Sequence, residues 1–322
     1  MPIIEFESNR CECNPGETLL ECLDRHNCPP PSSCQSGLCH TCLMRCVEGT
    51  PPPDAQNGLK ESLVTQGYFL PCVCQPQTDM KVTLPDESAA PQCSAKVIDK
   101  TFLSSSIVRL RLEVDDDFSY IPGQYINIFK DDTLTRTYSL ASVPALENYI
   151  ECHIEKLPEG KMSQWIFEEL DTGQTVHVSE ALGECFYQAD ETDKPLLMIA
   201  TGSGFAPIYG IVRDALNQGH QGEIHVYYGA SVKDKTYLVD EMKDMAKDHS
   251  NLHYHVSLSR ESISGYESGR ANELALSAHD DLKGWTVYMC GHPDMVKATQ
   301  RKAYLAGASL HNIHSDPFEF AK

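Results

Sequence analysis

The stretch Cys34-Gln35-Ser36-Gly37-Leu38-Cys39-His40-Thr41-Cys42 carries three cysteines in a C-x4-C-x2-C spacing. A fourth cysteine, Cys72, follows thirty residues after Cys42. Four thiolates arranged in this way, three of them from one tight loop, can hold a metal centre. Gly37 helps the loop to curl so that backbone N–H groups point at the sulfur atoms. The stretch therefore predicts that the first part of the chain folds around a metal centre.

The spacing of the four cysteines is that of a plant-type [2Fe–2S] site, with the fourth ligand arriving from a distant strand. We expect Cys72 to be that ligand, and Cys74 is the alternative. Zinc is the competing metal, held by pairs such as Cys39/Cys42, but zinc sites usually repeat a C-x2-C pair and this sequence contains one. The other thiols of the region are expected to be small buried residues: Cys11, Cys13, Cys22, Cys28 and Cys46.

Composition limits the classes of partner. The chain has 322 residues, a formal net charge of -20 and 14 cysteines, ten of them between Cys11 and Cys74. The negative charge argues against nucleic acid and anionic lipid, and it suits either solubility or the steering of a basic partner protein. The sequence has no apolar run of the roughly eighteen residues that a membrane span needs, and Met1–Glu7 does not resemble a secretory signal. We therefore expect a cytoplasmic protein.

Three regions with different patterns follow one another along the chain. Residues 1–87 are cysteine-rich and are followed by a linker. Residues 93–192 contain period-two strands and one helix at 162–170, which predicts an antiparallel barrel. Strands and helices alternate in residues 193–322, which predicts a doubly wound parallel sheet covered on both faces. The sequence thus predicts three domains.

One strand of the expected barrel, Arg136-Thr137-Tyr138-Ser139-Leu140, carries groups that suit a flavin nucleotide. Arg136 can hold a pyrophosphate through its planar guanidinium. Tyr138 shares a face with Arg136 and offers a flat ring, and Ser139 can hydrogen-bond the flavin edge. Gly160-Lys161-Met162-Ser163 opens the expected helix, where exposed N–H groups suit a phosphate. Together the two segments predict a flavin site.

Two glycine turns follow strands of the third region. Thr201-Gly202-Ser203-Gly204-Phe205-Ala206-Pro207 joins a buried strand to a helix, and Pro207 stands where a G-x-G-x-x-G pattern has its third glycine. Cys290-Gly291 follows the last predicted strand, at 286–289. Because the carboxyl ends of parallel strands share one edge, we expect both turns to contact a dinucleotide. The thirteen histidines show no metal-like pairing in the sequence.

The cluster, flavin and nucleotide segments, in this order, resemble the ferredoxin–NADP reductase-like family whose members carry an N-terminal plant-type ferredoxin domain. That family includes the reductase components of phenol hydroxylase, soluble methane monooxygenase and benzoate dioxygenase, and a reductase acting on a CDP-glucoseen sugar. The resemblance covers essentially the whole chain. Three positions depart from the family pattern: Gln35 replaces an Arg, Ser203 a Thr and His292 a Pro. No departure removes a ligand.

The resemblance implies a β-grasp ferredoxin domain at 1–87, an FAD-binding barrel at 93–192 and an NAD(P)-binding domain at 193–322. It implies FAD rather than FMN, with an aromatic residue near the C-terminus, Phe318 or Phe320, covering the flavin. Ser139, Cys290 and Phe320 are the expected catalytic residues. The metal ligands are expected to be Cys34, Cys39, Cys42 and Cys72. The expected cofactor-binding residues are Arg136, Thr137, Tyr138, Ser139, Gly160, Lys161, Met162, Ser163, Thr201, Gly202, Ser203, Gly204, Pro207, Cys290, Gly291 and Phe318.

The expected function is hydride transfer from NAD(P)H to FAD, followed by single-electron transfer through the [2Fe–2S] cluster to a partner protein. NADH is favoured, and NADPH is the alternative because Arg260 follows a strand of the nucleotide region and Arg can bind a 2′-phosphate. The leading acceptor is the oxygenase of a multicomponent monooxygenase or dioxygenase. A non-oxygenase acceptor, such as a sugar-modifying or radical enzyme, is the alternative, and a zinc-binding non-redox module is the third hypothesis. We expect a monomer.

Overall fold

The computed structural model describes residues 1–30, 32, 42–59, 61–85, 92–115, 118–131, 134–188 and 192–318. The chain divides into two compact units, Met1–Pro91 and Gln92–Lys322. Within the described residues, no helix combines the length and the apolar character needed to cross a membrane.

The first unit is built on a five-stranded mixed sheet. Its strands, in spatial order, are β2 (Asn9–Glu12), β1 (Ile3–Phe6), β5 (Met80–Thr83), β3 (Met44–Glu48) and β4 (Tyr68–Phe69). β1 and β5 are parallel, and the other neighbours are antiparallel. Three short helices complete the unit: α1 (Leu19–Arg25), η1 (Pro53–Gln56) and α2 (Glu61–Thr65). The expected β-grasp ferredoxin fold is confirmed.

Helix α1 begins with a capping box. The Thr18 hydroxyl accepts a hydrogen bond from the Glu21 backbone N–H at 3.3 Å, and the Glu21 carboxylate accepts one from the Thr18 N–H at 2.8 Å. The helix buries one apolar side against the sheet: Leu19, Leu20, Cys22 and Leu23. This burial places the helix over the core.

The second unit begins with a six-stranded antiparallel sheet. Its strands, in spatial order, are β10 (Ile150–Glu155), β7 (Ile107–Glu113), β6 (Gln92–Phe102), β11 (Thr175–Ser179), β8 (Tyr125–Asp131) and β9 (Leu134–Ser139). An isolated bridge between Leu140 and Cys152 joins the two edges and closes the sheet into the predicted barrel. Helix α3 (Lys161–Glu168) packs Met162 and Ile166 into the barrel core. It ends two residues before the predicted end at residue 170.

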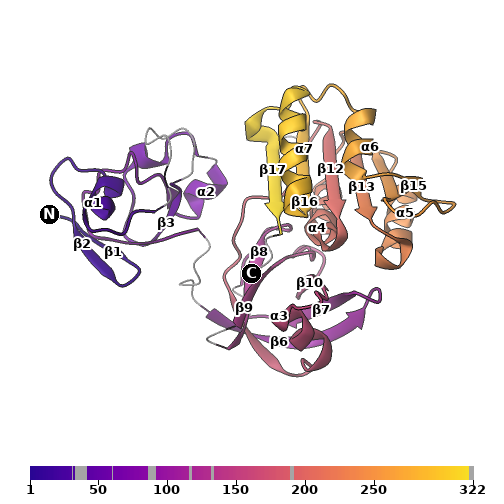
Figure 1. Cartoon of the computed structure of the whole chain (residues 1–322), viewed down its shortest axis with the longest axis horizontal. Helices are drawn as coiled ribbons and strands as arrows, with labels where there is room; N and C mark the ends of the chain where they lie inside the picture. The colour runs from indigo at the N-terminus through magenta and orange to yellow at the C-terminus, as the bar shows by residue number, and fades with distance from the viewer. Residues whose placement is uncertain are drawn as a thin grey trace. The chain divides into compact units, whose positions relative to one another are not determined.

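The rest of the unit is a six-stranded parallel sheet (Figure 1). Its strands, in spatial order, are β15 (Glu267–Ser268), β14 (Leu252–Leu258), β13 (Ile224–Ala230), β12 (Leu196–Thr201), β16 (Thr286–Gly291) and β17 (Ile313–Pro317). The sequence analysis missed β15, which has two residues, and β17. β17 was missed because its sequence, Ile-His-Ser-Asp-Pro, has one apolar residue before the proline and no clear alternation.

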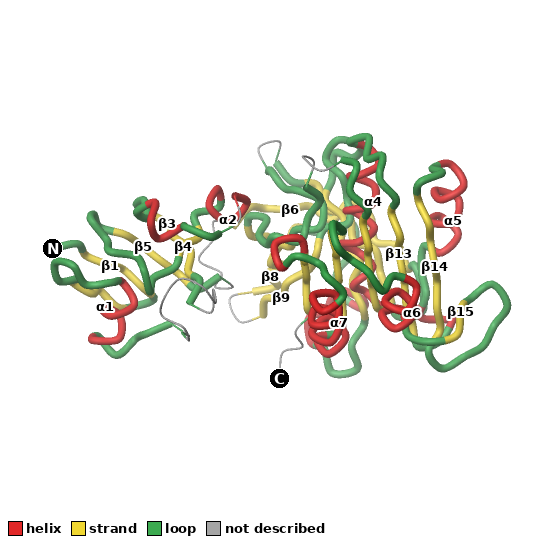
Figure 2. The backbone as a smooth tube through the Cα atoms, turned by 90° about the horizontal axis from the view of Figure 1, so that it is seen from above, coloured by secondary structure: helices red, strands yellow, loops and turns green. Residues whose placement is uncertain are grey.

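Helices cover both faces of this sheet, which confirms the doubly wound fold. Figure 2 shows α4 (Phe205–Asn217) and α5 (Val239–Asp248) on one side, and α6 (Ala271–Ala278) and α7 (Pro293–Leu305) on the other. The connections from β12 outward run through α4 and α5, whereas those toward β16 and β17 run through α6 and α7. The switch point therefore lies between the adjacent strands β12 and β16, where such sheets bind ligands.

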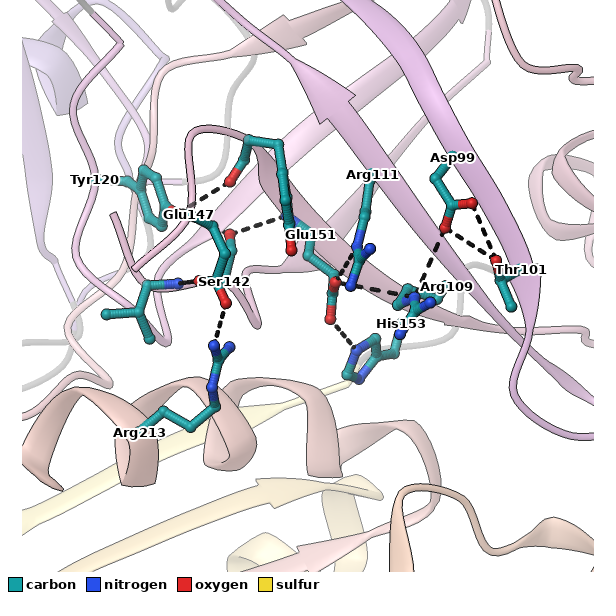
Figure 3. A network of polar contacts seen from close by, with 12 residues as sticks. Asp99, Thr101, Arg109, Arg111, Tyr120, Ser142, Glu147, Glu151, His153 and Arg213 are labelled. Atoms are coloured by element: carbon teal, nitrogen blue, oxygen red, sulfur yellow. Dashed lines mark hydrogen bonds and ion pairs between the residues drawn. The ribbon is translucent and has the colours of Figure 1, made fainter. Parts of the chain in front are cut away.

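A buried carboxylate sits between the barrel strands and α4. Glu151 on β10 is 4 % exposed, and it accepts hydrogen bonds from Arg111 at 2.7 Å and from His153 at 2.9 Å (Figure 3). Figure 3 also shows Arg213 of α4 reaching Glu147, with which it forms an ion pair. The Arg213–Glu147 ion pair joins the barrel to α4, whereas the Glu151 contacts link β10 to β7 within the barrel.

Candidate functional site

Two of the predicted cluster cysteines lie side by side in the first unit. The Sγ atoms of Cys42 and Cys72 are 3.3 Å apart, and the two residues are 3 % and 6 % exposed. This distance is far beyond the roughly 2.05 Å of a disulfide, and both thiols are free. The residues share an apolar pocket with Leu20 and Leu70. Two soft donors that converge in a dry pocket fit a thiolate-bound iron–sulfur centre.

The alternative ligand Cys74 has a different environment. It is fully buried in the main core of the unit with Ile4 and Phe6, and burial raises the pKa of its thiol to about 12. Cys72 lies in a turn after β4, not in a strand as expected, and its side chain packs in a different apolar cluster from that of Cys74. The geometry favours Cys72 beside Cys42. Cys34 and Cys39 lie outside the described residues.

Three of the remaining thiols of the first unit pack in its core, as expected of small buried residues, whereas Cys28 and Cys46 are only partly buried against it. Cys11, Cys13 and Cys22 are each at most 1 % exposed, and Cys28 is partly buried with its Sγ 3.8 Å from that of Cys11. Burial raises the pKa of all four thiols. Neutral, buried thiols are inert, so their abundance reflects packing.

The two predicted flavin segments meet in space, because α3 contacts β9. Arg136 is exposed, whereas Tyr138 is partly buried against the barrel core. The Ser163 hydroxyl accepts from the Leu157 N–H at 3.1 Å and donates to the Gly160 carbonyl at 3.0 Å, so it shapes the turn before α3. An exposed guanidinium on a strand that contacts this helix fits a diphosphate group.

Ser139 has a partner that the sequence analysis missed. Its hydroxyl donates a hydrogen bond to the Asp316 carboxylate at 2.6 Å, which links β9 to β17. The hydroxyl hydrogen is therefore occupied, and the Oγ lone pairs are what Ser139 can offer to a bound group. The available signal was Asp316 itself, which stands in Asp316-Pro317-Phe318 beside the predicted aromatic residue. The Phe318 N–H donates to the Gly291 carbonyl at 2.9 Å, and Phe320 lies outside the described residues.

The two glycine turns pack directly against each other at the switch point. β12 ends at Thr201, a short helix η2 (Gly202–Gly204) follows, and α4 starts at Phe205 with Pro207 buried in its first turn. A Cβ atom added at Gly204 would lie 2.4 Å from the Cys290 carbonyl oxygen. Gly291 has φ +124°, and a Cβ there would lie 2.5 Å from the Thr201 Oγ1. Glycine is thus required on both sides, because the backbones of the two turns are in contact. Their contact with a dinucleotide stays a prediction.

Cys290 is more enclosed than its expected role suggests. It is fully buried, and its Sγ lies 3.6 Å from the Sγ of Cys185. Burial and the neighbouring Cys185 raise its pKa well above the usual thiol range, so Cys290 is a neutral thiol. Its contact with a nicotinamide stays a prediction.

Replacing Gly204 with Ala should weaken nucleotide binding. The new methyl group collides with backbone atoms, so the two turns must separate, and we expect the KM for NAD(P)H to rise about 10- to 100-fold. Steady-state ferricyanide reduction measures this value independently of the acceptor protein. Gly219→Ala is the control: its φ of +78° means that the added methyl group strains the backbone, but nothing lies within 4 Å of the new Cβ, so stability should fall while the KM stays unchanged. An unchanged KM in Gly204→Ala would remove this turn from the nucleotide site.

Comparisons with known proteins agree with this geometry. Residues 4–77 match the 2Fe-2S iron-sulfur cluster binding domain, residues 94–187 the oxidoreductase FAD-binding domain and residues 198–301 the oxidoreductase NAD-binding domain. The chain is 29 % identical to the reductase component of the naphthalene 1,2-dioxygenase system of Pseudomonas putida, over 94 % of both chains. It is 27 % identical to the CDP-6-deoxy-L-threo-D-glycero-4-hexulose-3-dehydrase reductase of Yersinia pseudotuberculosis, over 94 % of this chain and 93 % of the other. The crystal structure of an Amycolatopsis cytochrome P450 reductase superposes with a TM-score of 0.70 at 26 % identity, covering 99 % of both chains.

The fold, the thiol pair, the glycine turns and the three domain matches together define the class of protein. The chain is an NAD(P)H-dependent iron–sulfur flavoprotein oxidoreductase, and its cofactors are a [2Fe–2S] cluster, FAD and a nicotinamide nucleotide. The chain belongs to the ferredoxin–NADP reductase-like family that carries an N-terminal [2Fe–2S] ferredoxin domain.

Proposed function

We propose that this chain is the reductase component of a multicomponent oxygenase, which takes a hydride from NADH and delivers single electrons to the oxygenase. The observation that carries the proposal is the combination, in one chain, of two converging buried thiols with a flavin-type barrel and a nucleotide sheet. The naphthalene dioxygenase reductase and an aromatic O-demethylase reductase subunit from Amycolatopsis support it.

When bound, FAD accepts two electrons as a hydride and releases them singly, which matches the one-electron capacity of a [2Fe–2S] cluster. The residues of the chain would bind the flavin and the dinucleotide and orient them. The Arg136 guanidinium suits the diphosphate, and Ser139, fixed by Asp316, offers an oxygen lone pair at the flavin edge. The turns at Gly204 and Gly291 bring backbone to the dinucleotide. Hydride transfer needs no general acid or base, and we assign none.

The site and domain assignments made from the sequence are part of this proposal. The domain boundaries are 1–87, 93–192 and 193–322, supported by the separate sheets. Cys34, Cys39, Cys42 and Cys72 would hold the cluster, supported by the Cys42–Cys72 pair. We also propose that the protein is monomeric and cytoplasmic, and that its acidic charge favours a basic docking face on the acceptor.

A sugar-modifying acceptor is the second candidate, because the Yersinia relative is named for a hexulose-3-dehydrase. The match of residues 4–77 to a 2Fe-2S domain sets the zinc hypothesis aside. The test is electron delivery: the purified chain with NADH should reduce a dioxygenase terminal component, and it should reduce a sugar dehydrase much more slowly. The opposite ranking would transfer the proposal to the second candidate.

Anaerobic stopped-flow mixing should separate the two nicotinamides. We expect NADH to reduce the flavin first and the cluster afterwards, with NADPH at least about 10-fold slower because a 2′-phosphate needs a dedicated cation. Arg260, the sequence candidate for that cation, is exposed, and its backbone N–H donates to the Ser231 carbonyl. Equal or faster flavin reduction by NADPH would overturn the assignment of NADH.

A further inference from the structure

Four histidines that are scattered in the sequence gather on one face of the parallel sheet. His225 on β13 stands directly beside His253 on β14, and His255 stands beside Tyr227. His279 follows α6 and packs on His225 from the helix side, with ring centroids 4.5 Å apart. His225 and His253 lie near the amino ends of their strands, whereas the glycine turns are at the carboxyl ends. The cluster is therefore at the edge of the sheet remote from the nucleotide turns.

Three side chains of this cluster bring ligand atoms together. The Glu223 Oε2 and His225 Nε2 atoms are 3.1 Å apart, and the ligand atoms of Glu223, His225 and His253 all lie within 4.8 Å of one another. Ligands that bind one zinc ion at about 2.0–2.2 Å stand roughly 3.3–3.5 Å apart in a tetrahedron. Glu223 is 65 % exposed on its side chain and can rotate, whereas the stacked rings of His225 and His253, inclined at 22°, must tilt toward each other for both nitrogen atoms to face one ion.

The surroundings of these side chains suit a metal ion. The His225 side chain is 14 % exposed, so the site is partly shielded from water. Two imidazoles and one carboxylate are a donor set found in zinc sites that keep a fourth, open position. The His225 ring is held between His253 and His279, and Trp285 packs on both His225 and His279.

We propose that Glu223, His225 and His253 bind one divalent transition-metal ion, with zinc as the best fit and water in the fourth position. This site is separate from the iron–sulfur centre in residues and in chemistry, because its ligands are nitrogen and oxygen atoms. A bound ion would join the amino ends of β13 and β14 and stabilise that edge of the sheet.

Equilibrium dialysis of the holoenzyme against Zn²⁺, followed by metal analysis, tests the site. We expect the wild-type protein to bind one equivalent of Zn²⁺ more than the His253→Ala and Glu223→Gln variants do. If the variants still bind that equivalent, their affinity for it should be at least about 10-fold weaker. His311→Ala, which removes an exposed histidine elsewhere, should match the wild type. Zinc held by thiols is common to all four proteins and cancels in the comparison.

Folding is checked by unchanged flavin and cluster absorption in each variant. Glu223 is exposed, so Glu223→Gln tests the site even where His253→Ala fails to fold. Equal zinc stoichiometry and affinity in the wild type and Glu223→Gln would overturn the proposal. A second expected result is a rise in melting temperature on adding Zn²⁺ to the wild type that is absent in Glu223→Gln.

Discussion

Replacing Cys72 with Ser should abolish the cluster while leaving the flavin in place. The variant removes a donor that lies 3.3 Å from Cys42 Sγ in a dry pocket, and a hydroxyl is a poor substitute for a thiolate toward iron. We expect iron and acid-labile sulfide to fall below about a tenth of the wild-type content, and electron delivery to cytochrome c to fall about 100-fold or more. Reduction of ferricyanide, which can take electrons from the flavin, should persist.

Cys74→Ser is the matched control, two residues away. It places a hydroxyl in the main core, so it should cost stability of about 1–3 kcal/mol while the iron content stays near that of the wild type. Loss of iron in Cys74→Ser with retention in Cys72→Ser would exchange the roles of the two residues. Iron and sulfide analysis of anaerobically purified protein decides between them.

Replacing Glu151 with Ala should produce the largest loss of stability in the second unit. The change leaves the Arg111 guanidinium without its carboxylate partner and leaves the buried His153 without the hydrogen bond to Nε2. Breaking a buried ion pair from one side costs about 3–5 kcal/mol. Urea unfolding followed by far-UV circular dichroism measures this loss. Asp244→Ala removes an ion pair in which both side chains are at least 70 % exposed, and it should change the free energy of unfolding by less than about 1 kcal/mol.

The same carboxylate should make stability depend on pH. Burial opposes ionisation of Glu151, but its interactions with His153 and Arg111 prevail and lower its pKa from 4.5 to about 2. Between these values the unfolded state binds more protons, so the stabilisation is complete above about pH 4.5 and is lost as the pH falls toward 2. Glu151→Ala should flatten this part of the curve. An equally steep fall in the variant would assign the acid sensitivity to other groups.

The sequence predicted those parts of the fold that local patterns determine. The alternation of strands and helices in residues 193–322 reflects burial on two faces, and it was enough to predict the doubly wound sheet. β17 was missed because an edge strand needs few apolar residues. Asp316 was missed for a different reason: its partner Ser139 is far away in the chain and lies in the barrel sheet, so only the packing of the barrel against the nucleotide sheet brings the two together.

The histidine cluster shows the same limit of sequence analysis. His225, His253 and His279 have no regular spacing, and their proximity comes from the register of β13 with β14 and from the position at which α6 ends. The four cysteines of the cluster motif were visible in the sequence because three of them share a single loop. The sequence preferred Cys72 as the fourth ligand but left Cys74 as an alternative. The choice depends on which thiol faces the pocket of Cys42.

The hydrogen bond from Ser139 to Asp316 has a practical consequence for handling the protein. It spans 177 positions of sequence, and its acceptor stands close to the carboxyl end of the chain. Proteolytic trimming or a tag that disturbs β17 would act on the strand that carries Asp316, and it would release the hydroxyl of Ser139, the residue that we propose at the flavin edge.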